Sequence, residues 1–404
     1  MYAYIARQPI FSKARKINAY ELLFREGDSN CFPEIDGDAA TMQLLSNAFM
    51  TTNINNYTGG KKAFINFTRN LLINRIPLML PQKTTVVEIL EDVMAEKDVL
   101  ESCREIVRRG YKIALDDFIY DINLSPLISL ADIIKFDFRQ SSIDDIVRDI
   151  HQLEKYNLKF LAEKVETYEE FRSAVELGFD YFQGYFFSKP EMIRKKKLSS
   201  TKLNLLRILN EVGRLDTDYD KLENYISNDL TVSYKLLRYV NSPYFRRSAE
   251  ISTIQQAITL LGQNEIRRFI SLMSMEGLCT DKPEELVKLS SVRAKFCELL
   301  ALAAPQTSTN PQELFMLGLF SLLDAILDFP MEDLLKELPL SPHIKEALMS
   351  RKGFDAYFLR LITSYEKGRW DDVAFCSSML DIQDNQLPGF YLEAIQWGDM
   401  LANL

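Results

Sequence analysis

Short apolar runs alternate with longer segments of helical periodicity between residues 1 and 190. Runs of four to eight residues rich in β-branched and aromatic side chains predict strands. Apolar residues three and four positions apart predict helices between them, as for Val99, Cys103, Ile106 and Val107, which would share one helical face. The predicted strands cover residues 2–7, 18–25, 62–67, 84–90, 112–118, 132–137, 159–165 and 181–187. Eight strands that alternate with helices are typical of a closed (β/α)8 barrel or of an open doubly wound sheet.

A polar residue lies at or toward the C-terminal end of seven of these strands. In a barrel these ends meet at one rim, whereas in an open sheet they are spread along a line. The residues two positions earlier are mostly apolar and share a face with the polar ones, so they would fill the barrel interior. We therefore predict a TIM-like barrel with Glu21, Asn66, Glu88, Asp116, Lys135, Glu163 and Gln183 at its rim, above Ala19, Phe64, Val86, Ala114, Ile133, Leu161 and Tyr181.

Strand signals nearly vanish after residue 190. The segment 191–202 carries a basic run and two serines, which is typical of a linker or of the start of a solvated helix. Later apolar positions recur with helical spacing and predict helices at 203–212, 233–240, 254–261, 266–275, 284–303 and 313–327. We predict an α/β barrel domain over residues 1–190, a linker over 191–202 and an all-α domain over 203–404.

Composition narrows the class of protein. The net charge of -9 disfavours a general nucleic-acid binder, which needs a surplus of Lys and Arg. The 5 cysteines are widely separated, and this argues against a disulfide framework or a zinc site and for a reducing compartment. The N-terminus lacks a signal-peptide core, and the most apolar helical segment, 314–327, is too short to span a membrane. We expect a cytoplasmic protein without a membrane span.

The predicted rim residues carry the oxygen ligands that Mg²⁺ and Mn²⁺ prefer. One ion would be bound by the carboxylates of Glu21, Glu88 and Asp116 and the amide oxygen of Asn66. A second ion would be bound by the carboxylates of Asp117 and Glu163. Two such ions can stabilise the attacking and leaving oxygens of phosphodiester cleavage. Lys135 and Gln183 would orient a hydrolytic water.

Simpler roles stay open for individual residues. Asp116 and Asp117 could cap the next helix, because Asp is a favoured N-cap. Lys135 could form only a buried ion pair with Asp137, and Glu163 could belong to the helix start that follows it. Seven polar residues on seven successive strands are, however, hard to attribute to capping.

The polar residues also lie in motifs with a recognisable order. These are Gln8-Pro9-Ile10, Glu21-Leu22-Leu23-Phe24-Arg25, Phe64-Ile65-Asn66-Phe67, Glu88-Ile89-Leu90-Glu91, Leu115-Asp116-Asp117-Phe118, Ile134-Lys135-Phe136-Asp137, Ala162-Glu163-Lys164-Val165-Glu166 and Gln183-Gly184-Tyr185. As an ordered set they resemble an EAL domain, the cyclic-di-GMP phosphodiesterase family, although the literal Glu-Ala-Leu is absent. The resemblance spans nearly all of residues 1–190.

The resemblance implies a role for each residue type. It implies two Mg²⁺ or Mn²⁺ ions bound by Glu21, Asn66, Glu88, Asp116 and Asp117. It also implies catalytic roles for Lys135, Glu163 and Gln183. Arg25 and Gln8 would contact the ligand, since a guanidinium offers a forked set of donors to a phosphate.

The helical half carries a second resemblance. Residues 236–245, which include Asn241-Ser242-Pro243, and residues 251–262 resemble an HDOD domain, a helical relative of HD phosphohydrolases that lacks their metal-binding residues. Neither His151 nor His343 is followed by Asp, so the sequence cannot form an HD-type metal site. We expect this half to be a regulatory domain or to bind a protein partner that the sequence does not identify.

Two functions follow from these resemblances. In the first, the barrel hydrolyses cyclic-di-GMP to linear pGpG with Mg²⁺ or Mn²⁺. In the second it is a catalytically silent sensor or scaffold, because residues 119–124 replace the Gly-rich loop of the family, and glycine allows backbone shapes that Ile and Tyr resist. The retained rim carboxylates favour the enzyme. That loop is associated with dimerisation in active members, so a homodimer stays open.

Overall fold

The computed structural model describes residues 2–27, 54–188, 230–242, 251–278, 282–305, 307–338 and 340–402, with positions 205, 209, 226, 227 and 245. A few of these, 24–27 among them, are described by backbone alone. The chain forms two compact units, one of Met1–Phe187 with Ser364–Asp371 and the other of Ser188–Thr363 with Asp372–Leu404. The predicted linker 191–202 lies outside the described residues, as does nearly all of the predicted helix 203–212.

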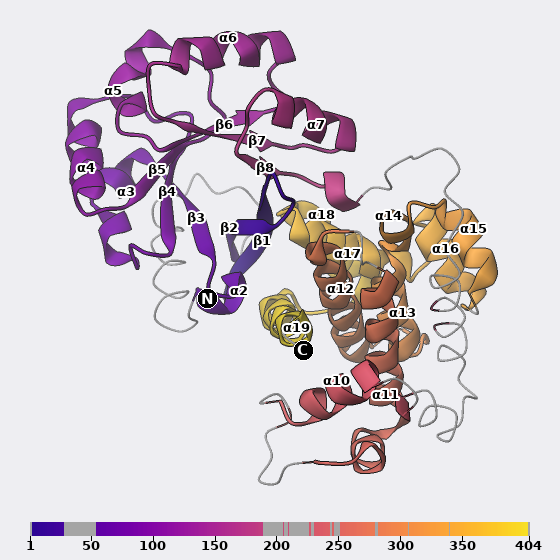
Figure 1. Ribbon diagram of the computed structural model, residues 1–404. Coiled ribbons are helices and arrows are strands. Elements are labelled where there is room, and N and C mark those ends of the chain that lie inside the picture. Colours follow the sequence, from indigo (N-terminus) through magenta and orange to yellow (C-terminus); the bar gives the residue numbers. More distant parts are fainter. Residues whose placement is uncertain are drawn as a thin grey trace. The chain divides into compact units, whose positions relative to one another are not determined.

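Eight strands close into a barrel in chain order, which confirms the barrel over the open sheet (Figure 1). They are β1 (Tyr2–Ser12), β2 (Ile17–Gly27), β3 (Lys62–Phe67), β4 (Thr85–Ile89), β5 (Lys112–Leu115), β6 (Ile133–Asp137), β7 (Lys159–Glu163) and β8 (Tyr181–Gln183). Strands β2 to β8 are parallel, but β1 is antiparallel to both β2 and β8. Only residues 13–16 connect β1 to β2, so this pair is a hairpin without the crossover helix of a regular (β/α)8 barrel.

Figure 1 shows the helices of this unit outside the strands. Helix α4 buries Val99, Cys103 and Ile106 completely, as the apolar spacing predicts, but Val107, which was predicted on the same face, is 36% exposed. Helix α7 begins with a capping box, in which Thr167 and Glu170 satisfy each other's backbone N–H groups. The helical segments are α2 (Asn55–Thr58), α3 (Arg69–Ile73), η1 (Ile76–Met79), α4 (Lys97–Arg108), η2 (Ile122–Leu124), α5 (Ser125–Ile128), α6 (Ile143–Leu153), α7 (Tyr168–Glu176) and η3 (Phe186–Ser188).

One apolar layer fills the barrel below its rim. It consists of Ile10, Ala19, Phe64, Val86, Ala114, Ile133 and Leu161, with Tyr181 packed against it. Strand alternation predicts every member except Ile10, which the antiparallel β1 contributes. This layer closes the interior of the barrel. The next inward-pointing side chain of each parallel strand, two residues closer to its C-terminal end, must therefore lie at the rim.

Four predicted strands end before their apolar runs do, β4 by one residue, β7 by two, β5 by three and β8 by four. Strand β5 ends at Leu115, not Phe118, because Asp117 adopts a left-handed conformation with φ 37°. Strand β8 ends at Gln183, not Phe187, because Gly184 has φ 141° and the 3-10 helix η3 follows. At both places the chain turns where a polar residue reaches the rim.

The other unit is helical over the residues that the structure describes. Its elements, with the helices that border it, are α10 (Leu230–Val240), α11 (Ile254–Leu278), α12 (Glu284–Ala303), α13 (Pro311–Phe320), α14 (Leu323–Leu327), α15 (Met331–Glu337), α16 (Pro342–Ser350), α17 (Ala356–Glu366), α18 (Trp370–Leu380), η5 (Asp384–Gln386) and α19 (Leu387–Ala402). Helix α12 packs against α13 and α19. Among the described helices, none has the length and apolarity needed to cross a membrane.

One predicted helix boundary agrees with the structure and another differs. The helices predicted at 254–261 and 266–275 are separated within α11 by a kink at Gly262, which has a non-helical φ of 74°. The helix predicted at 313–327 is broken into α13 and α14, since Ser321 hydrogen-bonds the Gly318 carbonyl at 2.8 Å and Leu322 leaves the helical conformation.

Candidate functional site

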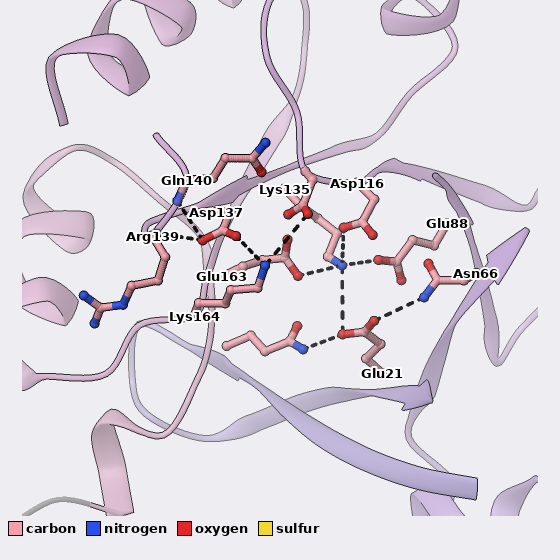
Figure 2. Close-up of polar contacts among 12 residues, drawn as sticks. Glu21, Asn66, Glu88, Asp116, Lys135, Asp137, Arg139, Gln140, Glu163 and Lys164 are labelled. Carbon is pink, nitrogen blue, oxygen red and sulfur yellow. Dashed lines mark hydrogen bonds and ion pairs between the residues drawn. The ribbon is translucent and has the colours of Figure 1, made fainter. Parts of the chain in front are cut away.

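Lys135 on β6 lies at the centre of the rim, and its side chain is fully buried. Its Nζ contacts Glu88 and lies 2.8 Å from Asp116 Oδ1 and 2.8 Å from Glu163 Oε1. Glu21 Oε2 is 4.0 Å away. Figure 2 shows these carboxylates arranged around the ammonium. A buried charge is tolerated only when it is paired, and here four carboxylates from different segments of the barrel surround one lysine.

The Glu21 carboxylate is held by two amide side chains. Asn66 Nδ2 donates to Glu21 Oε1 at 3.4 Å, and Gln183 Nε2 donates to Glu21 Oε2. Gln183 Nε2 also lies 3.0 Å from Gln8 Oε1. Strand register explains the grouping, because Gln8 is opposite Glu21 in the β1–β2 hairpin and Asn66 is opposite Glu88 across β3 and β4.

The paired aspartates reach the site through an unusual backbone. In a regular strand, adjacent side chains point to opposite faces, so Asp116 and Asp117 could not both face the rim. The left-handed φ of 37° at Asp117 breaks that alternation. Asp116, Asp117 and Glu163 consequently each offer an oxygen within 4.8 Å of the others.

The site provides oxygens that fit a divalent cation. Besides the aspartate group, Glu21, Glu88 and Glu163 also bring three carboxylate oxygens within 4.8 Å of one another. Four of the buried oxygens at this rim have no hydrogen-bond partner among the described residues, namely Asn66 Oδ1, Glu88 Oε2, Glu163 Oε2 and Gln183 Oε1. Because buried polar atoms are rarely left unpaired and carboxylate and amide oxygens are hard ligands, this donor set is suited to a divalent metal ion.

Lys135 keeps its charge inside the barrel. Burial opposes the ammonium, but the carboxylates of Glu163, Glu21, Glu88 and Asp116 outweigh it, and the pKa of Lys135 is raised well above its ordinary value. Lys135 is therefore a fixed positive charge at neutral pH. It can donate hydrogen bonds, but it cannot accept a proton.

The carboxyls divide into two groups. Burial, the largest influence, raises the pKa of Glu88 and of Glu163 well above the ordinary value, although Lys135 opposes it. Burial also acts on Asp116, but Lys135 outweighs it and lowers the pKa of that carboxyl. Burial and the charge of Asp116 raise the pKa of Asp117. Protons on Glu88 and Glu163 therefore compete with cations for the site.

Helix capping, the simpler role considered for Asp116, Asp117 and Glu163, is carried out by neighbouring residues. The first helical turn after β5 is capped by Asp121, not by Asp116 or Asp117. The capping box at the start of α7 uses Thr167 and Glu170. These contacts leave the rim carboxylates available.

Asp137 is the partner of a different lysine. It contacts the ammonium of Lys164, and its Oδ1 accepts hydrogen bonds from the backbone N–H groups of Arg139 and Gln140 at 2.6 and 3.3 Å. Lys135 pairs with other carboxylates, so the buried Lys135–Asp137 pair does not form.

The structure brings nearly all the predicted site residues together. Those at the rim are Gln8, Glu21, Asn66, Glu88, Asp116, Asp117, Lys135, Glu163 and Gln183. Arg25 lies on β2, but its side chain is outside the described residues. Sequence reasoning missed Lys164, which contacts Asp137 beside the site. Lys164 lies within the motif around Glu163, and its place there was the available signal.

Comparison with known proteins identifies the two units. An EAL domain matches residues 50–190 and an HDOD domain matches residues 198–378. Cyclic di-GMP phosphodiesterase CdgJ of Vibrio cholerae is 38% identical over 406 residues, which cover 99% of this chain and 93% of that protein. The chain belongs to the EAL–HDOD family. The uncharacterized protein YuxH of Bacillus subtilis is 37% identical over 98% of both chains.

Solved structures include an EAL domain protein from Listeria monocytogenes EGD-e. It is 22% identical with a TM-score of 0.38, over 46% of this chain and 87% of that one. Within this EAL–HDOD protein, the EAL match begins only at residue 50, so Gln8 and Glu21 precede it. The strand register nevertheless places both residues at the same rim as the matched part.

Proposed function

We propose that the barrel is a phosphodiesterase that hydrolyses cyclic-di-GMP to linear pGpG with Mg²⁺ or Mn²⁺. The observation that carries the proposal is the convergence of Glu21, Glu88, Asp116, Asp117 and Glu163 around Lys135 at one rim. The likeness to a named cyclic di-GMP phosphodiesterase over nearly the whole chain supports the same substrate.

Charge balance supports two ions. Once Glu88 and Glu163 have lost their protons, five carboxylates and the Lys135 ammonium leave four negative charges, which two divalent cations would balance. Glu21, Asn66, Glu88, Asp116 and Asp117 would hold them. Bound ions would supply charge stabilisation at the phosphate and lower the pKa of a nearby water. Gln183 would fix the orientation of Glu21, which it already bonds.

The reaction adds one water across one phosphodiester bond. An oxygen–phosphorus bond forms, the bond to the leaving ribose oxygen breaks, and the leaving oxygen is protonated. Lys135 stays protonated, so it would orient the water and stabilise the charge that develops on the phosphate oxygens. The proton from the water would pass to a carboxylate, for which Glu163, 2.8 Å from Lys135, is the best placed.

The direct test is hydrolysis by the purified full-length protein. Cyclic-di-GMP and Mn²⁺ are added, and chromatography follows the appearance of pGpG. Glu21→Gln removes one ligand charge while keeping the shape of the side chain, and it should abolish the product. A wild-type protein that binds cyclic-di-GMP without cleaving it would refute the proposed hydrolase activity.

A sensor is the second candidate, and the segment after Asp117 favours it. Ile119 and Ile122 are 57% and 63% exposed there, although both are apolar. Asp121 caps η2, and the Tyr120 N–H bonds Asp149 Oδ2 at 3.0 Å, so the segment is held by its own contacts. Binding without cleavage would support this function, and a surface of this kind suits a protein partner or a second copy.

The proposal also covers the helical domain, the cellular setting and the oligomeric state. The helical HDOD domain would regulate the barrel or bind a protein partner, with domain limits at 1–190 and 203–404 and a linker between them. Cys103 and Cys376 are buried free thiols, which supports a reducing, cytoplasmic setting. Size-exclusion chromatography with light scattering would test the homodimer.

A further inference from the structure

Lys164 lies beside the rim carboxylates without belonging to the set around Lys135 (Figure 2). Its Nζ contacts Asp137 Oδ2 and is 3.8 Å from Asp117 Oδ2. Its side chain is 54% exposed, whereas that of Asp137 is only 6% exposed. The ammonium therefore lies at the border between solvent and the aspartate group.

The backbone holds Lys164 in this position. Lys164 has φ 52°, a left-handed conformation that is uncommon outside glycine, asparagine and aspartate. As at Asp117, this breaks the strand alternation at the end of β7, so the consecutive residues Glu163 and Lys164 both reach rim carboxylates. Conformations of this kind cost free energy and concentrate at functional sites.

Asp137 is a fixed anchor for the ammonium. The backbone N–H groups of Arg139 and Gln140 already hold its carboxylate. Asp117 lies farther from Lys164, at 3.8 Å, and no hydrogen bond between them is formed. Asp117 thus has its carboxylate facing both this ammonium and the oxygens of Asp116 and Glu163.

We propose that the charge of Lys164 weakens cation binding by the Asp116–Asp117–Glu163 group, and so makes the two ions of the site unequal in affinity. This inference rests on the proposed function, because it concerns the second metal ion. A cation at this group would share Asp117 with a like charge that Asp137 holds in place. For a partly exposed charge the repulsion corresponds to roughly a three- to tenfold loss of affinity.

The test compares two substitutions at the same strained position in the full-length protein. Lys164→Met removes the charge and keeps the length, and Lys164→Arg keeps the charge. Lys112→Met is the control, since Lys112 pairs at 2.7 Å with Asp132 on the surface of the barrel. Binding of Mn²⁺ alone is followed by electron paramagnetic resonance of the free ion and by calorimetry, after circular dichroism has confirmed folding.

We expect Lys164→Met to bind the weaker of the two Mn²⁺ ions, the one at the Asp116–Asp117–Glu163 group, three- to tenfold more tightly than the wild type does. The affinity for the stronger ion should not change. Lys164→Arg and Lys112→Met should bind as the wild type does. Weaker binding in Lys164→Met would overturn the inference, because the lysine would then be holding Asp117 in place for the ion. Equal shifts in the Met and Arg variants, or no shift in either, would overturn it as well.

Hydrolysis is measured separately on the same proteins. A wild type that binds Mn²⁺ without forming pGpG refutes the phosphodiesterase, while the affinity shift in Lys164→Met still stands. An active wild type whose Lys164→Met variant shows no affinity shift refutes only the role of Lys164. In an active enzyme, Lys164→Met should reach half-maximal kcat at a three- to tenfold lower Mn²⁺ concentration, with KM for cyclic-di-GMP unchanged.

Discussion

Replacing Lys135 by Met tests whether one ammonium balances the rim carboxylates. Met keeps the apolar stem and removes the charge. Lys135 is fully buried and its Nζ contacts Glu88, Asp116 and Glu163. Removing one partner of a buried ion pair leaves an uncompensated charge and costs about 3–5 kcal/mol. We expect the free energy of unfolding of the metal-free barrel to fall by about that amount at pH 8.

The loss should depend on pH in a defined direction. The folded-state pKa of Glu88 and of Glu163 is raised, so their contribution to stability is present at low pH and is lost as pH rises through those pKa values. The raised pKa of Lys135 keeps its charge constant over this range. The stability difference between wild type and Lys135→Met should therefore be small at pH 5 and grow toward pH 8. Mn²⁺ should narrow it again.

Urea denaturation followed by hydrogen–deuterium exchange in peptides from β4 to β7 measures the barrel separately from the helical unit. Lys112→Met is the matched control, because its pair with Asp132 is exposed and such pairs contribute only about 0–1 kcal/mol. A Lys135→Met protein as stable as the wild type at pH 8 in chelator would refute our account of the charge balance. So would a stability difference that does not change with pH.

Three further predictions follow from the same contacts. Gln183→Ala should weaken Mn²⁺ binding about 10- to 100-fold in calorimetry, because it frees the carboxylate that Gln183 orients; unchanged affinity would contradict this role. Mn²⁺ binding should tighten from pH 5 to pH 8 and release protons, because Glu88 and Glu163 must ionise to bind the ion. Calorimetry in two buffers measures the protons released, and an affinity that does not change with pH would contradict this prediction. Gly184→Ala should destabilise the barrel by about 1–3 kcal/mol in urea, because φ is 141° and a Cβ would overlap the Val165 carbonyl, whereas wild-type stability would rule out that overlap.

The rim and the layer below it were predictable because both depend on the two-residue period of strands. Residues at alternate positions share a face whatever the fold around them, so an apolar residue such as Ala114 below Asp116 indicates an inward pair. The polar positions at strand ends then identify the rim, since parallel strands end on the same side. Polar residues at the ends of so many strands favour a single shared rim, so the same pattern also predicted that the eight strands close into a barrel.

The remaining features depend on backbone conformations that carry no sequence period. Strand β1 is antiparallel because a short turn joins it to β2, and the alternating strand and helix pattern conceals that hairpin. Asp117 and Lys164 both have a left-handed φ, and lysine is a residue type that rarely adopts it, so the sequence does not indicate the conformation at Lys164. Tertiary contacts select these conformations, and the role of Lys164 could be inferred only from the structure.

The two lysines suggest how the barrel tolerates a metal site before any metal is bound. A cluster of five carboxylates would oppose folding, and Lys135 offsets that repulsion from within the barrel while Lys164 does so from its edge. Neither lysine uses all the oxygens, since Glu88 Oε2 and Glu163 Oε2 have no hydrogen-bond partner in the described chain. The ammonium groups thus stabilise the metal-free fold and leave ligand atoms available. The same charges that permit folding then limit how tightly the cations bind, which links stability and metal affinity at one rim.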